Sequence, residues 1–156
     1  MKITLKGLAE RNKDLMSVLE RTRSLKPAMD AGAIDVQKLV DDAFYQSIDP
    51  NNGKSWAPLQ ETTTNRRRQG TGPKKKKRIH KPLIDTGRLR GSITAVGQDK
   101  AIVYGTNVSY AGTHQYGSRH VPMRRFLPTD FSSGPAAKVI EKIARKILKY
   151  LKNGAK

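Results

Sequence analysis

The pentapeptide LIDTG at residues 83–87 is the segment whose residue types come nearest to catalytic chemistry. In aspartic proteases, the carboxylate of such an Asp-Thr-Gly motif shares a proton with a second carboxylate and activates a water molecule, so a homodimer would be required here. Arg88 follows the glycine directly, and its cation favours ionisation of both carboxylates over a shared proton. We therefore predict that Asp85 is structural and that it caps a short turn over residues 86–89 by accepting backbone N–H groups.

Histidine is the other residue type that could bind a metal or act as a general base, and the chain has His80, His114 and His120. His114 and His120 are six positions apart, and the carboxylate nearest in sequence to this pair, Asp130, comes ten positions after His120. This spacing fits neither a helical ligand pair nor a zinc finger. The chain has no Cys, and no serine stands in a Gly-x-Ser-x-Gly context. We predict no catalytic residue, no metal and no cofactor, and hence a protein that is not an enzyme.

Positive charge dominates the composition, with 31 Lys and Arg against 13 Asp and Glu and a net charge of +18. Residues 62–82 hold nine of the basic residues and no acidic one. Ile79 is the single large apolar residue of this stretch, which therefore cannot bury enough surface to offset its ordering entropy. We predict a mobile basic loop at residues 66–82 that contacts DNA or an acidic partner surface, or that serves solubility alone. The nine basic residues are Arg66, Arg67, Arg68, Lys74, Lys75, Lys76, Lys77, Arg78 and Lys81.

The hydrophobic pattern predicts an α+β domain. Apolar residues recur every three to four positions over residues 8–48, which indicates two helices or one helix kinked at Pro27. The other expected elements are a lead-in strand at 2–6, a turn at 49–53, strands at 91–96 and 101–105 joined by 97–100, a helical turn within 107–128 and a terminal helix at 139–151. Their order predicts one domain over residues 1–156, in which a small antiparallel sheet is covered by the N-terminal helices and the C-terminal helix.

The predicted terminal helix carries basic residues on the faces that its apolar residues leave open. Such a helix suits a membrane surface. An antiparallel sheet, however, needs a cover for its apolar face, so we favour docking on the sheet. No apolar run approaches the roughly 20 residues of a membrane span, and the first residues lack the apolar stretch of a secretory signal. We expect a soluble, intracellular protein with no membrane partner.

A second group of residues combines aromatic side chains with glycine and proline in predicted loops. Trp, Tyr and Arg often anchor protein contacts, but aromatic residues beside glycine also pack loops against the rim of a core. We expect this group to form either such a rim or an interface. Its members are Trp56, Pro58, Asp85, Thr86, Gly87, Tyr110, His114, Gln115, Tyr116, Gly117, Pro122, Arg124 and Phe126.

In chain order these segments resemble the phage virion morphogenesis, or tail-completion, family of Mu-like and other tailed phages and of prophages. The resemblance covers about residues 40–130. It rests on Phe44, Gly53, Trp56, Pro58 and Leu59, on Leu83, Asp85, Thr86, Gly87, Leu89, Ser92 and Ile93, on Gly105-Thr106-Asn107, on Tyr110-Ala111 and His114-Gln115-Tyr116-Gly117, and on Pro122, Arg124, Phe126 and Leu127. Gly112 and Arg125 depart from the family pattern, and the basic stretch is long for its position.

The resemblance implies a non-enzymatic structural protein of virion assembly, a tail terminator or a neck protein. By analogy it forms a ring, a hexamer, around the DNA channel at the head–tail junction or the head-proximal end of the tail. Its partners would be copies of itself, tail-tube, sheath or connector proteins and, non-specifically, genomic DNA, with assembly in the cytoplasm of the bacterial host. The alternative is a stand-alone, sequence-independent nucleic-acid-binding protein that uses residues 66–81, although no helix-turn-helix or finger motif accompanies the charge.

Overall fold

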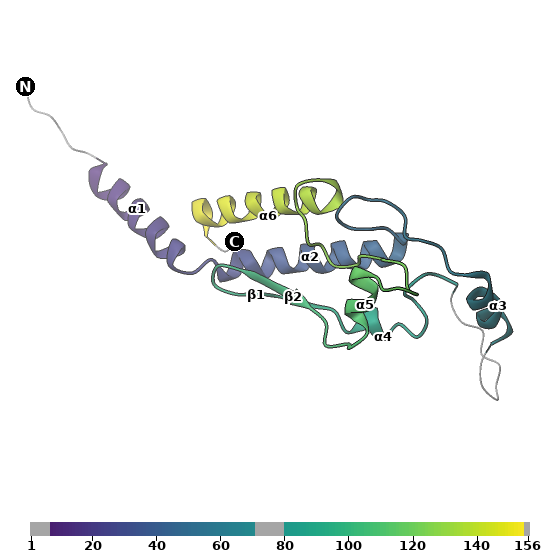
Figure 1. Ribbon diagram of the computed structural model, residues 1–156. Coiled ribbons are helices and arrows are strands. Elements are labelled where there is room, and N and C mark those ends of the chain that lie inside the picture. Colours follow the sequence, from purple (N-terminus) through teal and green to yellow (C-terminus); the bar gives the residue numbers. More distant parts are fainter. Residues whose placement is uncertain (1–6, 71–79, 155–156) are drawn as a thin grey trace, which may run out of the picture.

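The computed structural model describes residues 7–70 and 80–154. Within these ranges the chain forms helices α1 to α6 and a two-stranded sheet, in the order α1, α2, α3, α4, β1, β2, α5, α6 (Figure 1). No helix in the two ranges is long and apolar enough to cross a membrane. The strand predicted at residues 2–6 and five of the basic residues lie outside the described part of the chain, namely Lys74, Lys75, Lys76, Lys77 and Arg78.

The helical pattern over residues 8–48 forms two helices, α1 (Leu8–Arg23) and α2 (Lys26–Gln46). Pro27 lies in the first turn of α2, where its lack of an N–H removes no helical hydrogen bond and its fixed φ suits the helix. The chain leaves α2 through Ser47, whose left-handed φ of 58° ends the helix. Of the two predicted alternatives, the structure therefore has two separate helices.

The sheet is an antiparallel hairpin of β1 (Thr94–Gly97) and β2 (Ile102–Gly105). α2 passes very close to it at Gly97, where an added Cβ would stand 2.4 Å from the backbone nitrogen of Asp30. Glycine is required for such an approach between two backbones. Both predicted strands are confirmed, although the first begins later than expected because the short helix α4 (Arg88–Gly91) precedes it.

α2 is the central layer of the molecule: the hairpin packs against it, and α6 (Gly134–Asn153) lies along it as well (Figure 1). Gly32 of α2 makes room for both neighbours, since an added Cβ there would stand 2.8 Å from Ile102 and 3.3 Å from Ile143. The predicted α+β class, with N-terminal helices, a C-terminal helix and a small antiparallel sheet, is confirmed. In detail, the terminal helix docks mainly on α2, which is the helix that covers the hairpin.

Asp35 is a buried ionic link between α2 and α6. Its carboxylate accepts a hydrogen bond of 2.7 Å from the Lys142 ammonium group and forms an ion pair with Lys146. Burial by itself raises the pKa of Asp35, but the hydrogen bonds and charges of the two lysines outweigh it and hold the pKa below its ordinary value of 3.8. The lysine-rich helix is thereby fixed to the central helix through charge as well as through apolar contact.

The aromatic core lies at the C-terminal end of α2, around Phe44. The Phe44 ring is 5.6 Å from the Trp56 ring in an edge-to-face arrangement and 5.6 Å from the Phe126 ring. Phe44 and Phe126 are fully buried. The other buried members of this core are Val40, Ala43, Leu89, Ile93, Val108 and Ala111. The loop segments of the family motifs therefore fold onto one end of one helix.

Helix α3 (Glu61–Gln69) corrects the prediction of a mobile loop that begins at residue 66. Its last turn consists of basic residues whose charge suits the negative end of the helix dipole. None of its residues is buried, as the polar composition requires, and it projects from the body (Figure 1). Arg67 ties it down by donating hydrogen bonds of 3.0 and 3.2 Å to the backbone carbonyls of Lys81 and Ile84. The composition excluded a core position but contained no sign of this long-range contact. The basic residues of the last turn are Arg66, Arg67 and Arg68.

Candidate functional site

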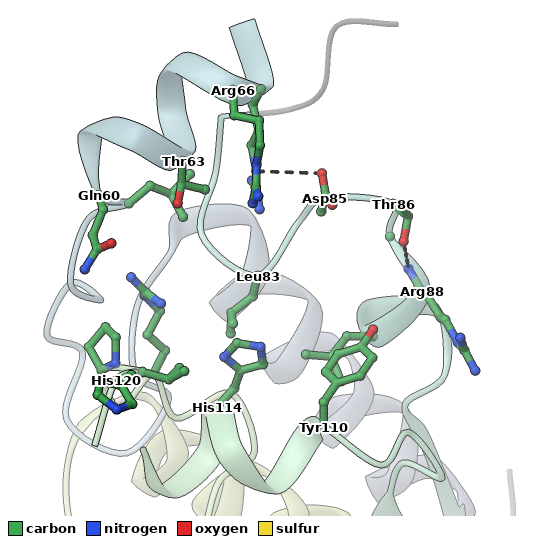
Figure 2. A pocket seen from close by; sticks show the side chains of 17 residues that line it. Gln60, Thr63, Arg66, Leu83, Asp85, Thr86, Arg88, Tyr110, His114 and His120 are labelled. Atoms are coloured by element: carbon green, nitrogen blue, oxygen red, sulfur yellow. Dashed lines mark hydrogen bonds and ion pairs between the residues drawn. The ribbon is translucent and has the colours of Figure 1, made fainter. Parts of the chain in front are cut away.

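A pocket of about 580 Å³ opens beside α3 (Figure 2). Its walls come from α3, from the LIDTG segment with α4, from α5 (Ala111–Tyr116) and from the turn after α5. These elements are distant in sequence, so the pocket exists only in the folded chain. The described residues that line it are Leu59, Gln60, Thr63, Arg66, Arg67, Leu83, Asp85, Thr86, Gly87, Arg88, Leu89, Tyr110, His114, His120, Val121, Pro122 and Arg124.

The pocket joins two groups of residues that the sequence analysis treated separately. Four arginines and two histidines line it, and Asp85 is the one acidic residue among its described lining residues. Arg66 and Arg67 come from the predicted basic loop. The pocket also contains seven residues of the aromatic and glycine group, which are Asp85, Thr86, Gly87, Tyr110, His114, Pro122 and Arg124. The structure thus places about half of that group at one exposed, positively charged surface.

Asp85 has a different partner from the one predicted. Its Oδ1 atom lies 3.7 Å from Nε of Arg67, in the ion pair that a dashed line marks in Figure 2. The N–H of Arg88, at the start of α4, donates instead to the hydroxyl of Thr86 at 3.4 Å. The prediction that Asp85 caps this turn is therefore wrong, because the arginine of α3 offers the carboxylate a charged partner. Asp85 and Arg67 together hold α3 at the edge of the pocket.

Arg124 is buried, and its side chain is hydrogen-bonded to the backbone. Its guanidinium Nε and Nη2 atoms donate hydrogen bonds of 2.8 Å each to the carbonyls of Ala57 and Pro58. Its backbone N–H donates to the carbonyl of His114 at 2.8 Å. Burial lowers the pKa of Arg124 from its ordinary value, and the positive charge of Arg67 acts in the same direction. Arg124 therefore connects the segment after Trp56 to α5 and forms the floor of the pocket.

His114 lies half-buried on the pocket wall. Its Nδ1 atom is buried and has no hydrogen-bond partner, and the edge of its ring meets the Tyr110 ring at 5.9 Å. Burial lowers the pKa of His114 below its ordinary value of 6.5, and the charge of Arg124 lowers it further. Both effects favour the neutral form of the His114 imidazole. It contributes an aromatic surface to the pocket, while the arginines contribute the charge.

The side chains of the pocket suit the binding of an acidic group. Arg66 and Arg88 are exposed there. Guanidinium groups form paired hydrogen bonds with carboxylates and phosphates. Among the described residues, the buried Nδ1 atom of His114 has no hydrogen-bond partner. No described group of three His, Asp or Glu side chains could hold a metal ion.

Other residues of the aromatic and glycine group belong to the core. Trp56 is buried against Phe44, and its indole N–H donates to the carbonyl of Arg125 at 2.7 Å. The Gln115 side chain accepts hydrogen bonds from the backbone N–H groups of Phe126 and Leu127 at 3.0 and 3.1 Å, and donates to the carbonyl of Leu127 at 3.0 Å. Gln115 thus acts as a substitute for a neighbouring strand. For these residues, of the two roles expected, the structure shows the core role.

Two members of the group, Tyr116 and Gly117, lie at the C-terminal end of α5 and do not line the pocket. Tyr116 is 73% exposed, and the lining residues Tyr110 and Pro122 are exposed as well. Gly117 has a left-handed φ of 79°, and a Cβ there would approach the Met123 backbone to 3.2 Å. The glycine therefore lets the chain turn sharply after α5, and Pro122 follows it on the pocket wall.

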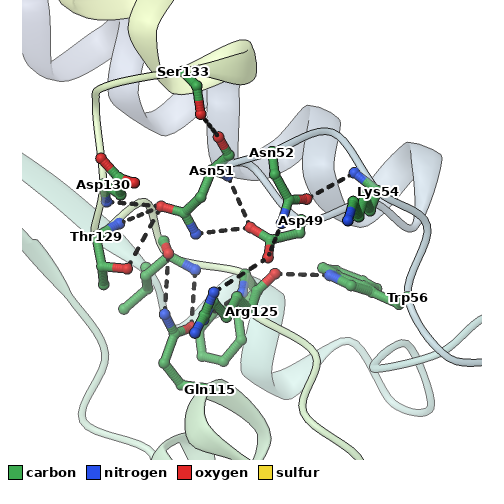
Figure 3. Close-up of polar contacts among 12 residues, drawn as sticks. Asp49, Asn51, Asn52, Lys54, Trp56, Gln115, Arg125, Thr129, Asp130 and Ser133 are labelled. Carbon is green, nitrogen blue, oxygen red and sulfur yellow. Dashed lines mark hydrogen bonds and ion pairs between the residues drawn. The ribbon is translucent and has the colours of Figure 1, made fainter.

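A buried polar hub centred on Asn51 was not predicted from the sequence (Figure 3). Its side-chain oxygen accepts hydrogen bonds from the backbone N–H groups of Thr129 and Asp130 at 2.7 and 2.8 Å. Its side-chain amide donates to the Asp49 carboxylate at 2.7 Å. The Asp-Pro-Asn-Asn-Gly cluster indicated a turn, which is present, but its residue types are equally common in exposed turns. Only the fold shows that this turn organises the segment leading into α6.

Three of the lining residues belong to none of the motifs noted in the sequence, namely Gln60, Thr63 and Val121. Gln60 and Thr63 lie at the start of α3, which Arg67 holds through its bonds to Lys81 and Ile84. Val121 lies in the turn after α5. Prediction of the pocket required these long-range contacts.

The fold and this surface define a small, basic α+β protein with an exposed cationic pocket, and the comparisons with known proteins identify its family. The chain belongs to the phage virion morphogenesis family, whose family model matches residues 7–152. The searches of curated proteins and of solved structures returned no match. The resemblance found in the motifs is confirmed, and a structural or assembly role in a phage virion follows at the level of the family.

Proposed function

We propose that this protein completes the phage tail or joins it to the head, as an oligomeric ring around the DNA channel and without catalytic turnover. Membership of the virion morphogenesis family supports the assembly role. The observation that carries the proposal at the level of residues is the cationic pocket beside α3, which suits an acidic segment of a neighbouring virion protein. In a closed ring each subunit repeats this pocket, so that weak individual contacts add up around the ring.

The pocket chemistry supports binding rather than hydrolysis. An aspartic-protease mechanism needs two carboxylates that share a proton. Asp85 instead faces Arg67, and the described residues lining the pocket supply no second carboxylate. The LIDTG segment therefore serves to hold α3 and to shape the pocket wall.

The direct test is made in a phage that carries this gene. Deletion of the gene is expected to leave particles with unfinished or unattached tails, visible by electron microscopy, and wild-type protein is expected to rescue them. The double variant Arg66→Glu/Arg88→Glu reverses two exposed pocket charges and should fail to rescue. Arg145→Glu, on an exposed position of α6, is the matched control and should rescue. The proposal fails if tails are complete without the gene and if the purified protein stays monomeric alone and with tail tubes.

One observation favours the second candidate function, sequence-independent DNA binding by residues 66–81. Arg66 and Arg68 are exposed on the projecting helix α3 and are free to reach a phosphate backbone. Lys81, by contrast, donates to the carbonyl of Tyr45 at 2.7 Å and lies over the Tyr45 ring, and Arg67 holds α3. Only part of the basic stretch is therefore available, which makes DNA contact a secondary role in this proposal.

DNA binding is tested by titrating duplex DNA at several salt concentrations. Each neutralised phosphate contributes a slope of about −0.9 to log K against log salt. The variant Arg66→Ala/Arg68→Ala should bind more weakly, with a slope reduced by about 2. Deletion of residues 66–81 should abolish binding and leave self-association intact. An affinity that does not depend on salt, or no affinity, would reject this function.

A further inference from the structure

Helix α1 carries an apolar stripe that no described part of its own chain covers. Leu8, Leu15 and Leu19 recur at helical spacing, Met16 flanks them, and each of the four is between 52% and 62% exposed. Figure 1 shows α1 extending away from the body of the molecule. Burial of a large apolar side chain contributes about 1.5–3 kcal/mol. A row of such side chains therefore marks a surface for contact with another molecule.

The junction between α1 and α2 is fixed in this extended position. Arg21 donates from Nη1 to the carbonyls of Leu151 and Lys152, at 2.8 and 3.1 Å. The N–H of Leu25 donates to the carbonyl of Asp99 at 2.9 Å. Folding α1 back along its own α2 would break these bonds to α6 and to the hairpin turn. The cover for the stripe is therefore expected to come from outside the chain.

The same chain presents a groove of matching character between α2 and β1. The groove has a volume of about 460 Å³, and its apolar lining includes Ala33 and Ile34 of α2 and Ala95 and Val96 of β1. Ile34 is 70% exposed and Val96 is 56% exposed. No described segment of the chain covers either side chain, so the groove, like the stripe, exposes apolar side chains to solvent.

The stripe and the groove agree in length. Leu8 and Leu19 are eleven residues apart, and so are Asp30 and Asp41, the residues at the two ends of the groove along α2. At 1.5 Å per residue both spans are roughly 16 Å. A helix lying in the groove would therefore bring its whole stripe into contact, with no large apolar side chain left over.

The spacing of the charges also agrees. Arg11 lies between Leu8 and Leu15 at helical spacing, and Arg23 lies one turn beyond Leu19, so two cations flank Leu15 and Leu19. Arg23 also pairs with Glu20 at 2.9 Å in an exposed contact. Asp30 and Asp41 place a carboxylate at each end of the groove. Their present pairs with Lys26 and Arg90 are solvent-exposed and therefore easily exchanged.

From these observations we infer that α1 of one copy docks into the α2–β1 groove of a second copy. Leu15 and Leu19 would then contact Ile34 and Val96 of the neighbour. Donor and acceptor are different surfaces of the chain, so the contact is heterologous and repeats from copy to copy, closing into a ring or continuing as a helix. This inference rests on the proposed ring and names the surfaces that would build it.

Cysteine cross-linking of the full chain tests the contact, because the protein contains no cysteine. Leu15→Cys and Ile34→Cys are prepared as separate proteins, mixed and oxidised, and disulfide-linked dimers are counted on a non-reducing gel. The mixture is expected to form heterodimers, and each variant alone is expected to form few. Lys13→Cys is the matched control on α1, because it lies away from the stripe on the same helix. Its mixture with Ile34→Cys should remain uncross-linked. All three positions are exposed, so circular dichroism should show wild-type folding.

A second measurement follows self-association by light scattering. Leu15→Glu is expected to weaken association at least tenfold, whereas Lys13→Glu should leave it nearly unchanged. Equal cross-linking of Lys13→Cys, or homodimers of either single variant in place of heterodimers, overturns the inference. If the wild-type protein forms rings but Leu15→Cys and Ile34→Cys never cross-link, the inference fails while the proposed function stands. If no condition, including added tail tubes, gives any oligomer, both fail.

Discussion

Trp56, Gln115 and Phe126 lie in or against the aromatic core, whereas Asp85, Tyr110 and His114 lie on the wall of an open pocket. Both sets come from the same short motifs, and His114 and Gln115 are neighbours in the chain. Two successive positions of α5 have different surroundings: Gln115 bonds to the segment at 126–127, and His114 lines the pocket. The same short motif therefore contains residues that pack the core and residues that form an accessible surface.

The two regions differ in which side chains make their hydrogen bonds. In the core region, the neutral side chains of Trp56, Gln115 and Asn51 bond to backbone groups, so that loops take the place of further strands. In the pocket region, the side chains that bond to backbone carbonyls are the charged ones of Arg67 and Arg124, and Arg67, on the projecting helix α3, also pairs with Asp85. The first region should therefore determine global stability, and the second should determine local order and binding.

The largest separation between the two regions is expected from Phe126→Ala. The side chain is fully buried against Phe44, so its removal leaves a cavity and should reduce the free energy of unfolding by about 3–5 kcal/mol. Tyr116→Ala, at an exposed position beside the pocket, should change it by less than about 0.5 kcal/mol. Urea denaturation followed by circular dichroism measures both values. Similar losses for the two variants would contradict the division.

A smaller but still large effect is expected from Asn51→Ala. The change removes a buried side chain and leaves the partly buried N–H groups of Thr129 and Asp130 without their acceptor, which should reduce the free energy of unfolding by about 1–3 kcal/mol. The exposed neighbour Asn52→Ala is the control and should lose clearly less. The same denaturation experiment measures both variants. Equal losses of unfolding free energy at the two positions would show that the Asn51 hub does not contribute to global stability as the core region does.

Much of this arrangement was accessible from the sequence, but not the part that depends on long-range polar contacts. Helical spacing located α1, α2 and α6, and the hairpin followed from two short apolar runs on either side of a turn. The pairing of Asp85 with Arg67 could not be foreseen, because it joins two segments through a stretch whose composition predicts no structure. Asn51 was recognised as a turn residue only, since burial of a polar side chain has no pattern of its own in a sequence. Local periodicity thus predicted α1, α2, α6 and the hairpin but not α3, and the contacts between the elements decided the pocket.

In the pocket region, a pH-dependent effect is expected from His114. The folded pKa of His114 lies below its ordinary value of 6.5, so the unfolded chain takes up the proton first as the pH falls. The stability contributed by neutral His114 is complete above about pH 6.5 and is lost as the pH falls from there toward the folded pKa. His114→Gln should therefore flatten the decline of the melting temperature below pH 6.5, relative to wild type.

The control for this titration is His120→Gln, at an exposed position in the same pocket. It should keep the wild-type dependence of the melting temperature on pH. Thermal melts between pH 7.5 and pH 5 measure all three proteins. A His114→Gln variant that retains the full wild-type decline would show that the acid sensitivity arises elsewhere in the molecule.

Arg67→Ala is expected to have only a small effect on the free energy of unfolding of the whole protein, but a large effect on hydrogen exchange in α3. The side chain bonds to the carbonyls of Lys81 and Ile84 and pairs with Asp85, but all of these contacts lie at the edge of the fold. Global stability should fall by about 1 kcal/mol or less, while the amides of α3 should exchange hydrogen much faster, because no buried residue anchors that helix. Arg66→Ala removes the same type of side chain one position earlier and should leave α3 protected. If α3 kept its protection from exchange in Arg67→Ala, other contacts than those of Arg67 would hold the helix, and the pocket would not depend on Arg67.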